Sequence, residues 1–110
     1  MLAPGRQYVN SPIRIGAHFE DDGGTDIDPT TVTFRLMSPQ GVETSYVYGT
    51  DAEVVKIDTG DFYAEVTPDE SGRWFWRWQT TGTNKTLAFE GNFLVQYSQF
   101  IEGVRRAYMP

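Results

Sequence analysis

The sequence predicts an all-β protein, a seven-stranded antiparallel β-sandwich, from three observations. Apolar and polar residues alternate in several separate segments, which is the period of a half-buried strand. Glycine, proline, asparagine and aspartate recur between these segments, so turns separate them at intervals of about ten residues. Aromatic residues, which favour strands, make up 15% of the 110 residues, so the chain holds enough of them for a strand-built core.

The first predicted strand shows the alternation clearly. Apolar side chains occupy one face from Ile13 to Phe19, and His18 and Glu20 lie on the opposite, polar face. An acidic turn with two glycines follows over residues 21–25. The other strands are predicted over residues 31–36, 42–48, 53–58, 62–66, 73–78 and 86–96.

Two of these segments carry a more detailed expectation. In the segment 53–58, alternation places Val55 and Ile57 towards the core. In the segment 86–96, Gly91 is expected to mark a β-bulge, because a glycine inside a strand packs nothing.

The segment 73–78 is the most aromatic part of the chain. Trp74, Trp76 and Trp78 share one face and are expected in the core, because a central strand needs one apolar face. Phe75 lies on the other face between two arginines, a composition typical of protein–protein contacts. Phe75 is therefore predicted to contact a neighbouring subunit, and a single aromatic residue on a solvated surface is the other interpretation.

Short terminal segments flank the predicted sandwich domain of residues 13–96. They are an irregular N-terminal arm, residues 1–12, and a C-terminal arm, residues 97–110. Both carry large apolar and aromatic side chains, which free chain ends seldom contain, so we expect them to contact a neighbouring subunit or the domain itself. The residues expected at a subunit interface are Tyr8, Val9, Phe75, Tyr97, Phe100, Ile101, Val104, Arg105, Arg106 and Tyr108.

Composition argues against several classes of function. Without cysteine, the chain has no disulfide, cysteine zinc site or thiol nucleophile, and its single histidine, His18, excludes multi-histidine metal centres. No apolar segment approaches the roughly 18–20 residues of a membrane helix, and no signal peptide is expected. A net charge of −6 argues against nucleic acid as a direct partner. We therefore expect neither membrane association nor specific nucleic-acid binding.

The acidic segment 20–28 and His18 are the remaining candidates for chemistry. Five carboxylates within nine residues suit Ca²⁺, but their spacing matches no EF-hand, and a solvated acidic turn is the other interpretation. His18 is predicted to be a lone surface histidine, because no nucleophile signature accompanies it. No catalytic, cofactor-binding or metal-binding residue is assigned, and no cofactor is expected.

Two resemblances concern the fold and the class of protein. Residues 69–75, Asp-Glu-Ser-Gly-Arg-Trp-Phe, resemble the E–F corner of immunoglobulin-like domains, with Trp74 in place of the usual tyrosine and without the cysteine pair of antibody domains. This implies an immunoglobulin-like sandwich. Over residues 8–96 the chain also resembles small proteins encoded in the structural-gene clusters of tailed bacteriophages and prophages. The segments that carry this second resemblance are 28–32, 38–41, 59–63, 72–78 and 90–95.

The second resemblance implies a virion component and no catalytic residues. We expect a non-enzymatic structural protein, a head–tail neck or connector component (adaptor or stopper), located in the virion and assembled in the bacterial host cytoplasm. Its expected partners are portal, adaptor, tail or major capsid proteins and further copies of itself. One alternative is a capsid decoration (cement) protein on the head surface. Another is a carbohydrate- or host-surface-binding module that uses Tyr46, Tyr48 and Tyr63.

Overall fold

The computed structural model describes residues 6–82 and 87–97, and in these ranges the regular elements are all strands. The eight strands are β1 (Arg6–Tyr8), β2 (Ile13–His18), β3 (Thr31–Met37), β4 (Glu43–Val47), β5 (Val54–Asp58), β6 (Asp61–Val66), β7 (Gly72–Thr81) and β8 (Ala88–Gln96). The all-β prediction is confirmed. The expected number of strands was too low by one, because three residues of the segment expected to be irregular form β1.

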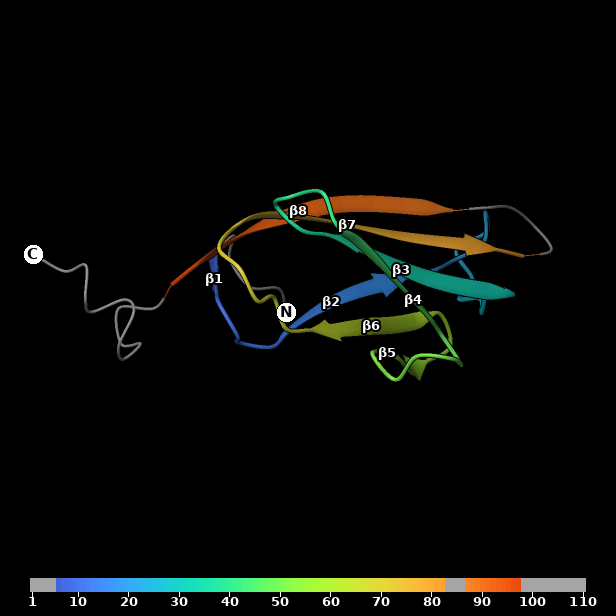
Figure 1. Ribbon diagram of the computed structural model, residues 1–110. Helices are drawn as coiled ribbons and strands as arrows, with labels where there is room; N and C mark the ends of the chain where they lie inside the picture. Colours follow the sequence, from blue (N-terminus) through green and yellow to red (C-terminus); the bar gives the residue numbers. More distant parts are fainter. Residues whose placement is uncertain (1–5, 83–86, 98–110) are drawn as a thin grey trace, which may run out of the picture.

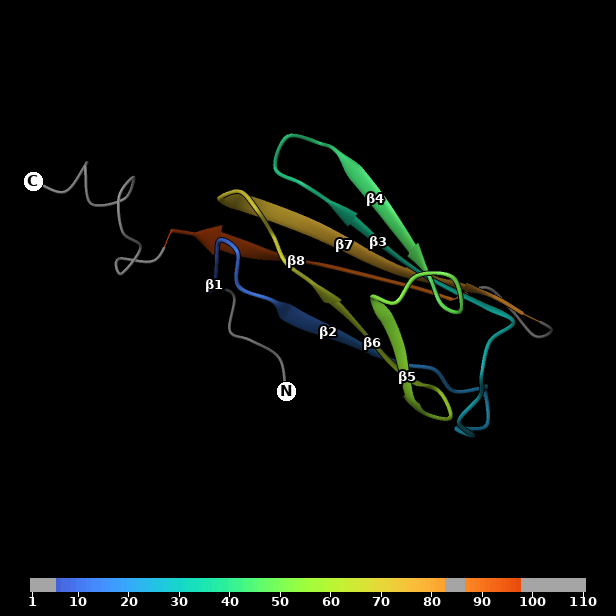
Figure 2. The same cartoon turned by 60° about the horizontal axis from the view of Figure 1, so that its bottom comes forward.

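The strands form two sheets that lie one above the other (Figures 1 and 2). One sheet has five strands in the order β1-β8-β7-β3-β4, and the other has three in the order β2-β6-β5. All neighbouring strands are antiparallel except β1, which runs parallel to β8, so the expectation of a purely antiparallel sandwich was wrong at this edge. The fold is a β-sandwich.

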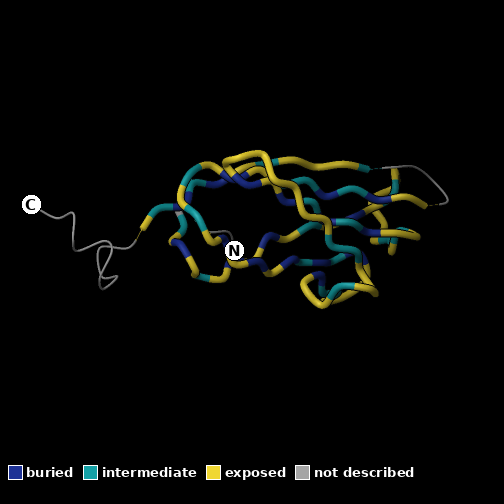
Figure 3. Tube along the Cα trace, in the orientation of Figure 1, coloured by how far each residue is buried: buried dark blue, intermediate teal, exposed yellow. Residues whose placement is uncertain are grey.

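The core lies between the sheets and is largely aromatic. Trp78 and Phe34 from the five-stranded sheet have ring centroids 4.9 Å apart, and Phe19, which follows β2, packs edge-on against Phe62 of β6 at 5.7 Å. Trp74 and Trp78 are buried and Trp76 is half-buried, as their shared face predicted. Figure 3 shows buried and exposed positions alternating along the strands, which is the pattern of two sheets with one wet face each.

The residues of β5 that face the core are not the expected ones. Val54 is buried, whereas Ile57 exposes 67% of its surface and Val55 is half-buried. The register pairs Val54 with Ala64, a fully buried residue of β6, and thereby turns Val54 inward. Because β5 is the outer strand of its sheet, it pairs with one neighbour only among the described strands, and its apolar residues are divided between both faces.

Gly91 marks no bulge, because it pairs in regular register with Trp76 across β7 and β8. A Cβ atom at this position would lie 2.3 Å from Cζ2 of the Trp76 indole. The glycine therefore makes room for the tryptophan ring on the inner face of the sheet, a close approach that no other residue allows without movement of the ring.

Candidate functional site

The outer face of the five-stranded sheet carries Phe75, the residue for which the sequence predicted a partner. The register places Phe75 directly beside Met37 of β3 on one side and Asn92 of β8 on the other. Phe75 and Met37 expose 43% and 37% of their surfaces, so they form an apolar pair in contact with solvent. We call Met37 and Phe75 the apolar pair.

Charged side chains border the apolar pair on the same face. Arg35 Nε lies 2.5 Å from Glu43 Oε2, and Arg77 donates to Glu90 Oε2 at 2.5 Å. Arg35 and Arg77 face each other in register and both donate to Gln79 Oε1 at 3.1 Å, which relieves their mutual repulsion. The hydrogen bond from Arg35 lowers the pKa of Glu43 from its ordinary value.

Together these residues line an open groove of about 360 Å³ that runs across β4, β3, β7 and β8. The apolar pair forms an apolar part of its lining, and the two ion pairs, Arg35–Glu43 and Arg77–Glu90, form the charged part. The groove therefore combines an apolar centre with charges of both signs.

The other residues predicted at an interface have different surroundings. Tyr8 ends β1, Tyr97 follows β8, and each exposes 44% of its surface. Val9 was expected outside the sandwich but is buried in its core, so its side chain is not presented to a partner. The predicted residues outside the described part of the chain are Phe100, Ile101, Val104, Arg105, Arg106 and Tyr108.

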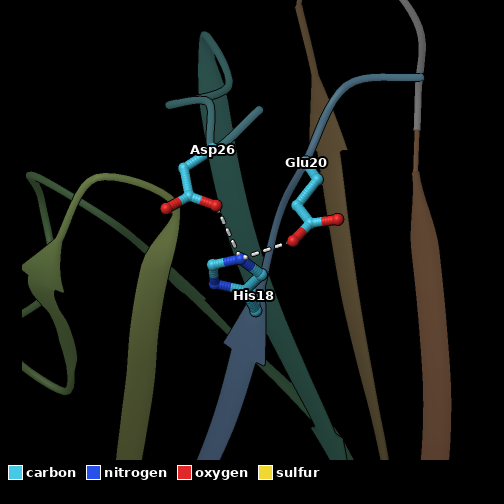
Figure 4. A group of neighbouring side chains, drawn as sticks. All are labelled: His18, Glu20 and Asp26. Carbon is cyan, nitrogen blue, oxygen red and sulfur yellow. Dashed lines mark hydrogen bonds and ion pairs between the residues drawn. The ribbon is translucent and has the colours of Figure 1, made fainter. Parts of the chain in front are cut away.

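A second candidate site lies on the other sheet, around His18. Its Nδ1 contacts Oδ1 of Asp61, its register partner on β6. Its Nε2 lies 2.9 Å from Asp26 Oδ1 and 3.2 Å from Glu20 Oε2 (Figure 4). Both ring nitrogens of the only histidine therefore face carboxylates, and the four side chains are 41–51% exposed. We call these four residues the histidine–carboxylate cluster.

The loop after β2 folds back to build this cluster. Glu20 and Asp26 pair across an isolated bridge, and the amide of Ile27 donates to the carbonyl of Phe19 at 3.1 Å. Inside the loop, Asp21 Oδ1 accepts the amides of Gly23 and Thr25 at 2.9 and 3.0 Å. This local closure brings the carboxylate of Asp26 back to the histidine, eight residues earlier in the chain.

Gly60 attaches the β5–β6 turn to the same loop. Its amide donates to Asp28 Oδ1 at 2.8 Å, and its carbonyl accepts the amide of Phe19 at 2.8 Å. Its φ of 77° lies in the left-handed region, and a Cβ atom would lie 2.6 Å from the Phe19 carbonyl oxygen. Only glycine fits here without backbone movement, and the turn positions Asp61 beside His18.

The charges of the cluster are not balanced. The hydrogen bond with Asp61 raises the pKa of His18 from 6.5 to about 8, desolvation opposes the rise, and Asp26 adds to it. Even a fully protonated imidazole supplies one positive charge against three carboxylates. The basic side chains of the same sheet are paired elsewhere, since Arg14 binds Glu65 at 2.8 Å and Lys56 binds Asp28 at 2.5 Å.

A shallow basin of about 620 Å³ adjoins the cluster. His18 and Asp61 line one part of it, and Tyr63, which lies under the Arg14 guanidinium at 4.3 Å, and the exposed Ile57 line others. The cluster can therefore exchange protons or ions with solvent. Its geometry suits the binding of a cation, because the carboxylates of Glu20 and Asp26 approach the same imidazole nitrogen.

Sequence reasoning treated His18 as isolated and the acidic segment as a separate feature. Strand alternation did contain a usable signal, because it places His18 and Glu20 on one face. Nothing in the sequence indicated that Asp26 and Asp61 lie near His18. The position of Asp26 depends on closure of the loop, and that of Asp61 depends on the register of β6 against β2.

The sequence matches no family model, and no curated protein shows significant similarity to it. Among the described residues, no helix is long and apolar enough to span a membrane.

Proposed function

We propose that this chain is a non-enzymatic structural protein of a tailed-bacteriophage virion, a head–tail connector component of the adaptor or stopper type. The resemblance of residues 8–96 to small proteins from phage structural-gene clusters supports the assignment to a virion. The single structural observation that supports docking is the exposed apolar pair of Met37 and Phe75 within a charged groove. The protein would be assembled in the bacterial cytoplasm, with portal, adaptor or tail proteins and copies of itself as partners.

We also infer that the sandwich is immunoglobulin-like. β8, β7, β3 and β4 follow one another as strands G, F, C and C′ do in variable-type immunoglobulin domains, and β2, β6 and β5 take the places of B, E and D. The indole N–H of Trp74 donates to the carbonyl of Glu70 at 3.0 Å, as a corner tyrosine bonds to backbone a few residues upstream. Such a sandwich is a rigid support for one flat docking face.

Docking through this face follows the usual anatomy of protein interfaces. The apolar pair supplies an apolar area whose burial is favourable, and Phe75 is of the aromatic type that is enriched in the cores of protein interfaces. The ion pairs around it supply a polar rim. Because exposed ion pairs contribute little in water, a partner with complementary charges can exchange them at little cost.

The head surface is an alternative position for the same docking face. A decoration protein would contact the major capsid protein, whereas a connector would contact portal, adaptor or tail proteins. The identity of the partner therefore separates these two versions of the proposal.

The tyrosines considered for glycan binding do not form one exposed strip. Tyr46 stacks on Phe34 on the inner side of its sheet, and Tyr48 packs edge-on against Phe62 at 5.2 Å. Tyr63 lies under Arg14 on the opposite sheet. Because a sugar-binding platform needs neighbouring exposed rings, the carbohydrate-binding alternative has no support from these three residues.

Co-expression with the portal, adaptor, tail and major capsid proteins encoded in the same genome tests the proposal. The full chain is expected to co-purify with a portal, adaptor or tail protein, and Phe75→Asp is expected to weaken that binding by roughly tenfold or more. Ile57→Asp is the matched control, because Ile57 is also exposed but lies on the other sheet, and it should bind normally.

Three outcomes would contradict the proposal or redirect it. A gene neighbourhood without capsid, portal or tail genes would overturn the virion assignment. Binding to the major capsid protein alone would replace the connector with the decoration protein. Equal loss of binding in Phe75→Asp and Ile57→Asp would show that the apolar pair is not the docking face.

A further inference from the structure

We propose that His18, Glu20 and Asp26 bind one divalent first-row transition-metal ion of the Zn²⁺ type, with Asp61 as the positioning residue. This inference is independent of the proposed function. It rests on the convergence of one imidazole nitrogen and two carboxylates at a single point on the surface, and on the separate contact that holds the other nitrogen of the ring.

The distances place the ligand atoms close enough to share one ion. A nitrogen of His18 and carboxylate oxygens of Glu20 and Asp26 all lie within 4.8 Å of one another. Zn²⁺ binds imidazole nitrogen at about 2.0–2.1 Å and carboxylate oxygen at about 2.0–2.2 Å, so two ligands of one ion lie roughly 3–4 Å apart. As Figure 4 shows, both carboxylates approach the same ring nitrogen, Nε2.

Asp61 supplies an observation from outside this group of three. It comes from β6, a different strand, and contacts Nδ1 of His18. Histidine ligands of metals usually donate their second ring N–H to a carboxylate, which selects the tautomer and orients the ring. With Nδ1–H directed at Asp61, the lone pair of the neutral imidazole is on Nε2, the atom that faces Glu20 and Asp26.

The type of ligand selects the class of metal. Ca²⁺ takes six to eight oxygen ligands, and the acidic segment alone suggested such an ion. The imidazole nitrogen changes this expectation, because imidazole suits Zn²⁺ and its first-row neighbours. A divalent ion also offsets the excess negative charge that one imidazole leaves on the cluster. Three protein ligands on an exposed surface leave coordination positions for water or for a group of a partner.

The single histidine allows a direct test on the full, untagged chain. Zn²⁺ is added in a neutral, chelator-free buffer while NMR records the ¹⁵N signals of the one imidazole and calorimetry records stoichiometry. We expect one ion per chain, a shift of the Nε2 signal larger than that of Nδ1, and much weaker binding of Ca²⁺.

The variants His18→Gln, Glu20→Gln and Asp26→Asn are expected to lose this binding. Asp61→Asn should weaken it by roughly 10–100-fold, because the residue orients a ligand without being one. Asp69→Asn is the control, since it removes an exposed carboxylate beyond the far end of β6 and should bind as the unmodified chain does. Unchanged imidazole signals on Zn²⁺ addition would overturn the proposal, as would equal binding by His18→Gln and Asp69→Asn. Ca²⁺ binding as tight as Zn²⁺ binding would overturn the choice of metal.

Discussion

The outer faces of the two sheets differ in how their charges are balanced. On the five-stranded sheet, Arg35 and Arg77 are matched by Glu43 and Glu90, and an exposed apolar pair lies beside them. On the three-stranded sheet, three carboxylates surround one imidazole. A face on which Glu43 and Glu90 are paired with arginines beside an apolar pair suits another protein, whereas a cluster with more carboxylates than cations suits a cation.

Each of the two sheets also depends on a position that requires glycine, and the physical reason differs between them. Gly60 supports the histidine–carboxylate cluster through a left-handed backbone packed against the carbonyl oxygen of Phe19. Gly91 supports the five-stranded sheet by leaving room for the Trp76 side chain. Because backbone yields less readily than a side chain, the first region is expected to be the more sensitive to a single added methyl group.

The largest expected effect is that of Gly60→Ala, which separates the loop of residues 20–28 from the β5–β6 turn. Left-handed strain and backbone overlap together should destabilise the fold by roughly 2–4 kcal/mol. Chemical denaturation measures this loss, and the pKa of His18 should fall towards 6.5 as Asp61 moves away. Gly49→Ala is the control, because Gly49 has a φ of 91° but open space around it, so only the strain remains. Equal losses in the two variants would refute the role given to the Phe19 carbonyl.

A smaller effect is expected for Gly91→Ala, which disturbs the five-stranded sheet alone. Movement of the Trp76 ring should cost about 1–3 kcal/mol and change the tryptophan fluorescence. Gly16→Ala makes the corresponding change in β2 of the other sheet, where the nearest atom to a Cβ lies at an ordinary 3.7 Å. It should leave stability unchanged or raise it by up to about 1 kcal/mol. A stable Gly91→Ala variant with unaltered fluorescence would contradict the close approach of Trp76.

The smallest expected effect is a pH dependence that belongs to the three-stranded sheet. The pKa of His18 is about 8 in the folded chain and 6.5 as its ordinary value. The contribution of the protonated imidazole is therefore complete below about pH 6.5 and is lost as the pH rises through about 8. Unfolding midpoints recorded across this range in metal-free buffer should fall with increasing pH. Asp61→Asn should flatten the fall, and an equally steep fall in that variant would rule out Asp61 as its main cause.

Strand alternation made much of the fold predictable. The positions of most strands and the burial of Trp74 and Trp78 follow from a period of two, which is a local property of the chain. Phe75 was also recognised correctly as an exposed aromatic residue, because alternation places it on the face opposite the tryptophans, with an arginine two positions away on either side.

The failures occur where a neighbouring strand decides the outcome. β1 has three residues, too few for a periodic signal, and forms because the edge of β8 accepts it in parallel. The phase of Val54 and Ile57 depends on the register of β5 against β6. Gly91 was expected to mark an irregularity, since the sequence does not reveal which side chain lies across from it.

The sequence by itself determined the all-β class, the strand alternation and the excess of negative charge, because each depends on residue type and on spacing of a few positions. Only the tertiary structure decided which distant groups meet. His18 and Asp61 are 43 positions apart and become partners through the register of β2 with β6. Met37 and Phe75 become one apolar pair through the register of β3 with β7. Pairing between strands brings together residues that are far apart in the sequence, and the local spacing of residues does not specify which strands pair or in which register.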